Sequence, residues 1–250
     1  MKEYKVIIFD LDGTLSDSGI GITKCVQYAL KKLNIIEEDL EKLKHFVGPP
    51  LKDELMKTYG CSEEQAKQGV EFYRERYTPI GIYETSLYEK VEQLLISLKE
   101  KGKIIALATS KPLGMAKEVI KYLHIEQYFD YVMGADLNGP IHNKNDVLLA
   151  LLNEINSVDK HETVMIGDTI FDIEGANSVG IDSIGVSYGY GVVEEMKEKG
   201  MESHKKIEVL DSESASAGQL EQALYIRDLC EQGLEFDEVV EKLRKFRDGM

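Results

Sequence analysis

The 250-residue chain has only three cysteines and five prolines. The cysteines, Cys25, Cys61 and Cys230, are odd in number and far apart, which argues against a disulfide framework and against a thiolate metal site. The low proline content, with 43% hydrophobic and 30% charged residues, is typical of a folded protein and excludes a disordered or fibrous chain. The length fits one large domain or two small ones.

The chain is also short of positive charge and of long apolar runs. Thirty Lys and Arg stand against 45 Asp and Glu, a net charge of −15, which disfavours binding to a nucleic-acid polymer. The longest apolar runs, 104–108 and 147–152, are far below the roughly 18 residues that cross a bilayer. Asp10 and Asp12 interrupt the first apolar stretch before it reaches the length of a secretory signal. We therefore expect a cytoplasmic protein with no membrane partner.

Short β-branched and aromatic runs alternate with helical patterns over most of the chain. Such runs occupy residues 4–9, 103–108, 163–167, 182–186 and 206–210, with a weaker one at 131–134. Between them, apolar residues recur at helical spacing; Ser86 and Glu89 form a capping-box pattern before one such helix, which ends at Gly102. This alternation predicts an α/β fold, a Rossmann-like parallel sheet flanked by helices.

The segment after the first strand departs from this alternation. Apolar residues recur at helical spacing from Ile22 to Leu33 and again over residues 62–77, with no strand-like run between them. So long a helical insertion predicts a separate small domain. We expect a core domain of residues 1–16 and 85–205, a helical insert of residues 17–84, and a C-terminal strand and helical extension of residues 206–250.

Two pairs of carboxylates follow strand-like runs. Asp10 and Asp12 follow the first run, and Asp168 and Asp172 follow the run at 163–167. Taken singly, the first pair is equally well explained as a solvated turn, and the second pair as residues that favour the start of a helix. Together they place four carboxylates at the carboxyl edge of one sheet, where ligands bind in such folds. Oxygen ligands of this kind suit Mg²⁺.

Polar residues follow a third run, and two of the lysines are placed unfavourably. Thr109, Ser110 and Lys111 end the run at 103–108, and Lys144 begins a helix with an apolar face. Both lysines lie near a helix N-terminus, where the macrodipole disfavours a cation by about 0.3 to 1 kcal/mol. Either lysine alone is explained equally well by a side chain that extends into solvent. Two lysines placed in this way at the same sheet edge indicate that an anion binds between them.

In this order, these residues resemble the four motifs of the haloacid dehalogenase (HAD) superfamily. The matching residues are Asp10-Leu11-Asp12-Gly13-Thr14, Thr109-Ser110-Lys111-Pro112, Lys144 and Gly167-Asp168-x-x-x-Asp172. The insert is similar to the C1 cap of that superfamily, and the resemblance covers roughly residues 1–200. Within the insert, residues 46–51 and 73–77 resemble the phosphoglycolate phosphatase-like and 5′-nucleotidase-like branch.

The resemblance implies a phosphoryl-transfer mechanism. Asp10 would attack phosphorus and form an aspartyl phosphate. Asp12 would protonate the departing alkoxide and then take a proton from the hydrolytic water. Asp10, the Asp12 main-chain carbonyl and Asp168 would hold Mg²⁺, with Asp172 in support.

The resemblance also assigns residues to the phosphoryl group. Thr109 and Lys144, with the amide of Ser110, would bind its oxygens and stabilise their charge in the transition state. It leaves the role of Lys111 open between an anion contact and a solvent-exposed side chain.

The helical insert should supply specificity, because the core motifs contact only the phosphoryl group. Gly48, Pro49 and Lys52 lie on a loop that could face the site, although a stiff turn between helices explains Pro49 better. Arg74 could meet a second anionic group, although a solvated helix face is the default. For the glycine-rich loop at 187–191 we expect a plain flexible turn.

The resemblance implies a Mg²⁺-dependent phosphatase that hydrolyses small phosphorylated metabolites, of 5′-nucleotidase-like or phosphoglycolate phosphatase-like type. Asp12 favours phosphoester hydrolysis over dehalogenation, because only phosphoester hydrolysis needs an acid that protonates a departing alkoxide. A sugar phosphomutase of the same superfamily and a non-catalytic binding or regulatory protein are the alternatives. The oligomeric state is left open.

The C-terminal 45 residues depart from the superfamily pattern. The stretch 206–219 and the helical pattern after it resemble part of the DegV family of fatty-acid-binding proteins. Because so short a segment cannot enclose an acyl chain, a final edge strand with covering helices is the better prediction.

Overall fold

The computed structural model describes residues 4–137, 139–156, 159–202 and 208–210. Its main sheet has six strands, all parallel, in the order β5-β4-β1-β6-β7-β8. The strands are β1 (Val6–Phe9), β4 (Ile104–Pro112), β5 (Tyr131–Ala135), β6 (Thr163–Gly167), β7 (Asp182–Val186) and β8 (Glu208–Leu210). The predicted α/β fold with a Rossmann-like parallel sheet is confirmed.

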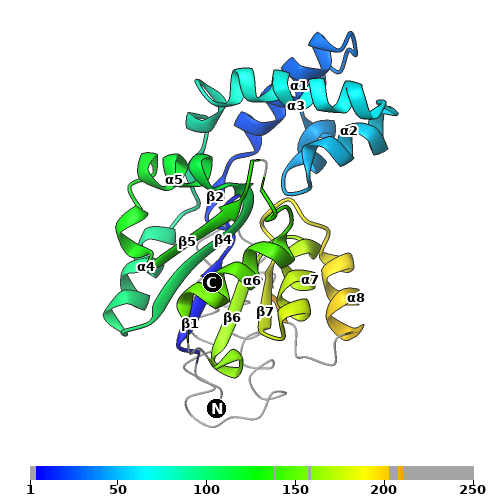
Figure 1. Ribbon diagram of the computed structural model, residues 1–250. Coiled ribbons are helices and arrows are strands. Elements are labelled where there is room, and N and C mark those ends of the chain that lie inside the picture. Colours follow the sequence, from blue (N-terminus) through cyan, green and yellow to red (C-terminus); the bar gives the residue numbers. More distant parts are fainter. Residues whose placement is uncertain (1–3, 138, 157–158, 203–207, 211–250) are drawn as a thin grey trace, which may run out of the picture.

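Helices cover both faces of this sheet (Figure 1). They are α4 (Val91–Glu100), α5 (Leu113–Tyr122), α6 (Lys144–Ile155), α7 (Ile170–Val179) and α8 (Val193–Glu202). Strand β1 is apolar at every position because it is buried on both sides: Ile7 and Phe9 belong to the cluster that includes α4 and α5, whereas Val6 and Ile8 belong to the one that includes α6 and α7. The period-two alternation of a strand thus sends neighbouring side chains into opposite layers.

A second group of helices is inserted between β1 and β4. It comprises α1 (Gly19–Lys32), α2 (Leu51–Tyr59) and α3 (Glu63–Tyr77), with 3-10 turns at Glu41–Phe46 and Gly81–Tyr83. The chain leaves the sheet through β2 (Ser16–Asp17) and returns through β3 (Ser86–Leu87), and these two short strands pair with each other in antiparallel fashion. In Figure 1 the inserted helices lie beyond the end of the sheet at which β1 and β4 finish.

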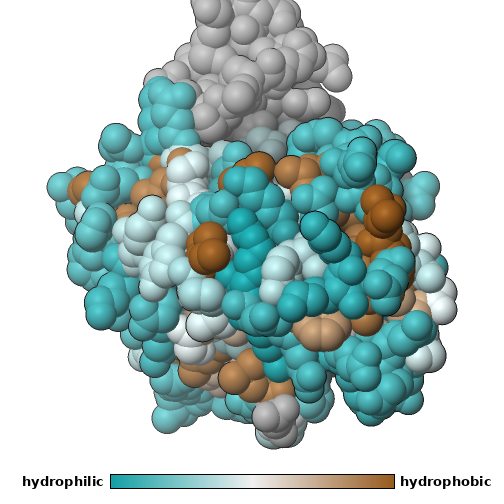
Figure 2. Space-filling model, turned by 90° about the horizontal axis from the view of Figure 1, so that it is seen from above, coloured by the Kyte–Doolittle hydropathy of each residue, from teal (hydrophilic) through white to brown (hydrophobic). Residues whose placement is uncertain are grey.

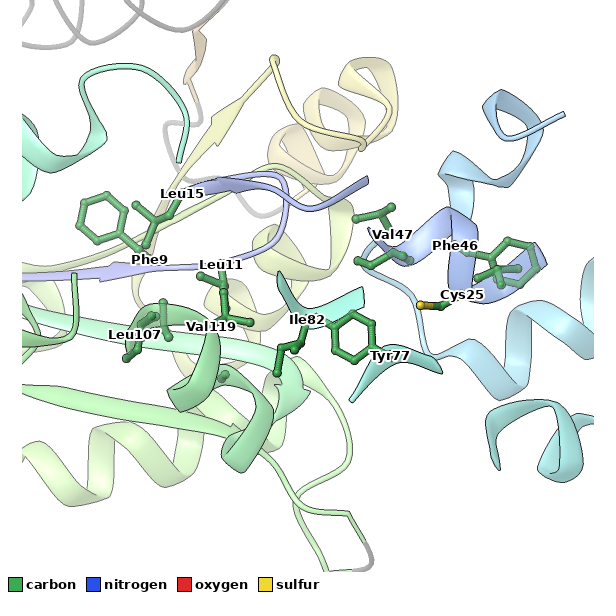
Figure 3. Close-up of a cluster of buried hydrophobic side chains, with 14 of the residues drawn as sticks. Phe9, Leu11, Leu15, Cys25, Phe46, Val47, Tyr77, Ile82, Leu107 and Val119 are labelled. Atoms are coloured by element: carbon green, nitrogen blue, oxygen red, sulfur yellow. The ribbon is translucent and has the colours of Figure 1, made fainter. Parts of the chain in front are cut away.

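One hydrophobic cluster runs from the sheet into the inserted helices (Figure 3). Phe9 and Leu107 come from the sheet, and Leu11 lies just after β1. Phe46 and Tyr77, both buried, come from the insert. This shared core fixes the insert above the carboxyl edge of the strands.

Two local expectations are wrong. Ser86 lies in β3 and does not cap a helix; α4 begins only at Val91, after Lys90 in the left-handed region (φ 62°). The capping-box pattern misled because the returning chain pairs with β2 before it turns into α4. Strand β4 also continues to Pro112, so Thr109 and its two successors lie within the strand.

The predicted strand at 206–210 is confirmed in part, as β8. The rest of the expected C-terminal extension, including its helical stretches, lies outside the described residues.

In the part of the chain that the structure describes, no helix combines the length and apolar character needed to cross a bilayer. On the face seen from above in Figure 2, hydrophilic residues predominate and apolar ones form small separate patches.

Candidate active site

The turn after β1 leaves the middle of the sheet, between β4 and β6. The backbone N–H of Asp10 donates to Ile166 of β6 at 2.9 Å, so the residue is still tied to the sheet as the strand ends. Gly13 adopts φ +86°, which favours glycine, and an added Cβ would lie 2.2 Å from an Asp168 carboxylate oxygen. The turn therefore presents Asp10 and Asp12, 6% and 8% exposed, at the carboxyl edge.

Three buried carboxylates, from the turns after β1 and β6 and from the first turn of α7, meet at this edge. One ligand oxygen from each of Asp10, Asp168 and Asp172 lies within 4.8 Å of the others. Asp168 is held by the Thr14 hydroxyl at 2.9 Å and by the Tyr190 backbone N–H at 2.8 Å. Neighbouring donors thus fix the carboxylate of Asp168 in place.

Asp172 is fixed by the start of its own helix. The backbone N–H and the hydroxyl of Thr169 both donate to its Oδ2, at 3.0 and 2.8 Å. Asp172 therefore does both things that the sequence offered as alternatives: it stabilises the helix start and it joins the carboxylate cluster.

Lys144 neutralises part of this negative charge. It is the first residue of α6, is 5% exposed, and its Nζ lies 2.7 Å from Asp10 Oδ1 and 2.8 Å from Asp172 Oδ1. The same ammonium donates to the Ala108 carbonyl at 2.9 Å. Its unfavourable place at a helix N-terminus is thus offset by two carboxylates, and the solvent-exposed alternative for Lys144 is excluded.

The cluster fits a small divalent cation. One ammonium faces three buried carboxylates, and burial raises the pKa of Asp10, with Lys144 opposing and Asp172 adding to the rise. Burial also raises the pKa of Asp168 well above its ordinary value, with the charges of Asp172 and Asp10 contributing. Burial is the main cause of both shifts and repulsion among the carboxylates adds to them, so a bound cation would stabilise the charged forms. An all-oxygen donor set of this kind suits Mg²⁺.

The end of β4 brings the remaining polar residues to the same place. Thr109 is buried, and its hydroxyl accepts from the Lys111 backbone N–H at 3.2 Å. Lys111 is only 9% exposed; its Nζ lies 2.8 Å from Asp12 Oδ2 and donates to the Tyr77 hydroxyl at 2.7 Å. The structure therefore decides the question that the sequence left open for Lys111: it contacts a carboxylate.

A cavity of about 760 Å³ lies between this edge and the inserted helices. The predicted site residues that line it are Asp10, Asp12, Thr109, Ser110 and Lys144 from the core, and Gly48, Pro49, Lys52 and Arg74 from the insert. Asp168 and Asp172 do not line the cavity but lie buried behind Asp10. The structure thus brings all the predicted site residues to one region.

The insert residues differ in what they contact there. Gly48 has φ +107°, and a Cβ on it would lie 3.1 Å from a Thr169 methyl group, so this loop lies against the core. Lys52 pairs with Glu63 at 2.9 Å. Arg74 lines the cavity and makes no ion pair with any residue that the structure describes.

Two parts of the site were missed by the sequence analysis. Tyr77, at the end of α3, carries the hydroxyl that contacts Lys111. The loop at 187–191 is no plain flexible turn: Tyr188 donates to the Thr14 carbonyl at 2.8 Å, and Tyr190 bonds to Asp17 as well as to Asp168. The glycines of this loop were the sequence signal for a close backbone contact. Gly191 shows why, because a Cβ at this position would lie 1.9 Å from the Asp168 carbonyl oxygen.

The comparisons with known proteins agree with this geometry. A family model described as haloacid dehalogenase-like hydrolase matches residues 7–186. A 5′-nucleotidase of Pseudomonas aeruginosa is 40% identical over 78% of this chain and 87% of its own length. A phosphoglycolate phosphatase of Colwellia psychrerythraea is 30% identical over 80% of this chain and 92% of its own.

A solved structure shares the fold. The crystal structure of a predicted phosphatase from Clostridium acetobutylicum superposes with a TM-score of 0.76 at 41% identity, covering 79% of this chain and 91% of that one. A second family model, described as an uncharacterised protein of the DegV family, matches residues 179–250, so this resemblance is also borne out and extends into β7 and α8. The chain belongs to the haloacid dehalogenase-like hydrolase family.

Proposed function

We propose that this chain is a Mg²⁺-dependent phosphatase that hydrolyses small phosphomonoesters, of 5′-nucleotidase or phosphoglycolate phosphatase type, through an aspartyl phosphate. The observation that carries this proposal is the contact of Lys144 with Asp10, inside a buried group of carboxylates that borders a cavity. Two relatives, one named 5′-nucleotidase and the other phosphoglycolate phosphatase, match this chain over most of their length and support the proposal.

In the first step, an Asp10 carboxylate oxygen forms a bond to phosphorus while the bond from phosphorus to the leaving oxygen breaks. Asp12 gives a proton to that oxygen, so the product leaves as an alcohol. In the second step, Asp12 takes a proton from water, whose oxygen bonds to phosphorus and releases Asp10. Splitting the displacement in two keeps each barrier low.

The remaining site residues hold charge in place. Asp10, the main-chain carbonyl of Asp12, Asp168 and Asp172 are the groups that would hold Mg²⁺, which when bound lowers the repulsion between the carboxylate and the anionic substrate. Thr109, Ser110 and Lys144 contact the phosphoryl oxygens, where preformed donors stabilise transition-state charge.

The inserted helices, residues 17–84, act as a cap over a core of residues 1–16 and 85–205, with residues 206–250 as a C-terminal extension. The cavity is within the size range of pockets that hold small metabolites. Gly48, Pro49 and Lys52 line its wall, and Arg74, which forms no ion pair with the described residues, offers its guanidinium to the part of the substrate beyond the phosphoryl group. These four residues therefore select among phosphomonoesters.

The test is release of inorganic phosphate from a panel of nucleoside 5′-monophosphates, 2-phosphoglycolate and sugar phosphates, with Mg²⁺ or with EDTA. We expect release with Mg²⁺ only, and none from Asp10→Asn. Lys99→Met, which removes an exposed ion pair with Asp130 far from the site, serves as the control. Equal activity of Asp10→Asn and wild type, or sugar-phosphate isomerisation without net phosphate release, would overturn the proposal.

A further inference from the structure

Lys111 is a buried cation whose two partners come from different parts of the molecule. It lies on β4 of the core, and its Nζ is 2.8 Å from Asp12 Oδ2. It also donates to the hydroxyl of Tyr77, on the cap helix α3, at 2.7 Å. An ammonium group withdrawn from water needs such partners, so removal of either leaves it poorly compensated.

The contact with Lys111 distinguishes the two oxygens of Asp12. Oδ2 is occupied by the ammonium, whereas Oδ1 is buried and has no hydrogen-bond partner among the residues that the structure describes. Asp12 lines the cavity. A buried carboxylate oxygen without a partner is costly unless a ligand or a reacting group completes it. The arrangement therefore holds Asp12 by one oxygen and leaves the other for the substrate.

Tyr77 brings the cap into this arrangement. Its ring is 2% exposed, stacks on Tyr73 with centroids 5.1 Å apart, and lies in the hydrophobic cluster near Ile82 (Figure 3). The Lys111 ammonium also lies 4.8 Å from the centroid of the Tyr77 ring. Because the cap fixes this ring, the position of the hydroxyl, and with it the second partner of Lys111, depends on where the cap sits.

We propose that Lys111 is the positioning residue for Asp12 and that Tyr77 makes this positioning depend on the cap. Lys111 anchors Oδ2, so that Oδ1 gives its proton to the leaving oxygen as the phosphorus–oxygen bond breaks and later takes a proton from the attacking water. This inference rests on the proposed function, in which Asp12 is the acid and the base.

The test compares two substrates that differ in their need for an acid. The first is an alkyl phosphomonoester that the wild type hydrolyses; the second is p-nitrophenyl phosphate, whose nitrophenolate leaves without a proton. The measured quantity is kcat/KM, which reports formation of the aspartyl phosphate. We expect Lys111→Met to lower kcat/KM about 100-fold for the alkyl ester, a loss in the range of general acid catalysis, and only a few-fold for p-nitrophenyl phosphate.

Two further variants allow the inference to be tested if Lys111→Met fails to fold. Tyr77→Phe keeps the stacked ring and Lys111 itself, and should change the ratio of the two kcat/KM values in the same direction, by about tenfold. Tyr28→Phe is the matched control, since it removes a cap hydroxyl that bonds to Glu75 on the exposed surface, and should leave the ratio unchanged.

Asp12→Asn separates the inference from the proposed function. If Asp12→Asn changes the ratio but Lys111→Met and Tyr77→Phe lower both kcat/KM values equally or not at all, the inference is wrong and the role of Asp12 stands. If Asp12→Asn also leaves the ratio unchanged, the acid role of Asp12 in the proposed function is wrong, and the inference fails with it.

Discussion

The ammonium of Lys144 lies 2.7 Å from Asp10 Oδ1, although 134 positions separate the two residues in the sequence. Its further contacts, with Asp172 at 2.8 Å and with the Ala108 carbonyl at 2.9 Å, join the turn after β1 to α7 and β4. One cation thus links the segments that carry the chemistry.

Removal of this cation should affect both stability and activity. Lys144→Met leaves two buried carboxylates without their partner and should lower the free energy of unfolding by about 3 to 5 kcal/mol. Loss of a donor to the phosphoryl oxygens should lower kcat by about 10²- to 10³-fold. Urea unfolding and steady-state kinetics measure the two effects. Lys99→Met, at an exposed pair, should cost less than about 1 kcal/mol; equal losses in the two variants would contradict our account.

The carboxylate cluster predicts that Mg²⁺ stabilises the folded protein. A cation that binds only the native state raises the melting temperature as its concentration exceeds its Kd. Thermal unfolding with increasing Mg²⁺ should show this rise in wild type and in Asp39→Asn, which changes an exposed acidic residue, but not in Asp168→Asn. A rise of the same size in Asp168→Asn would place the cation elsewhere.

The loop at 187–191 predicts a strong effect of a small substitution. In Gly191→Ala, the new Cβ would lie 1.9 Å from the Asp168 carbonyl oxygen, so the backbone must shift. A displacement of about 1 Å at a catalytic group costs about 10²-fold in rate, and we expect a loss of that order in kcat/KM. Gly114→Ala is the control because, apart from its chain neighbours and the backbone of its own helix, no atom of the described residues lies within 4 Å of its Cβ position. Wild-type kcat/KM in Gly191→Ala would show that the loop does not support Asp168.

Most of the core site could be predicted from the sequence. Asp10, Thr109 and Asp168 each follow an apolar run, and parallel strands bring their carboxyl ends to one edge whatever lies between them in the chain. The misplaced lysines carried further information, because a cation at a helix N-terminus needs an anionic partner, and both lysines contact carboxylates.

The contacts between cap and core could not be predicted. Tyr77 ends a helix whose apolar spacing is explained by packing alone, and its contact with Lys111 depends on how the cap sits on the sheet. The bonds of Tyr190 to Asp17 and Asp168 depend likewise on tertiary packing. The capping-box pattern at Ser86 failed for the same reason, since pairing with β2 overrode it.

A cluster of ion pairs within the inserted helices predicts a pH-dependent contribution to stability. Glu84 accepts from Arg76 at 2.8 Å and pairs with Lys24 at 3.0 Å, and these cations, Arg76 first, hold the pKa of Glu84 below its ordinary value of 4.5. A lowered folded-state pKa means that the carboxylate stabilises the fold above its unfolded-state pKa, and that this stabilisation is lost as the pH falls through the folded-state pKa.

Glu84→Gln should therefore lower the midpoint of urea unfolding at pH 7, and the difference from wild type should shrink as the pH falls below 4.5. Glu100→Gln, at the exposed end of α4, should show a small difference at every pH. If the difference in unfolding midpoint between Glu84→Gln and wild type grew as the pH fell, our assignment of a lowered pKa to Glu84 would be wrong.

The most direct test of our central claim, that Asp10 is the nucleophile, is to capture the covalent intermediate. The wild-type protein is mixed with Mg²⁺ and a radiolabelled phosphomonoester that it hydrolyses, quenched in acid within a single turnover, and digested for peptide mapping. We predict label on the peptide that contains Asp10 and none in Asp10→Asn. Label on another peptide, or phosphate release by Asp10→Asn at the wild-type rate, would contradict the account.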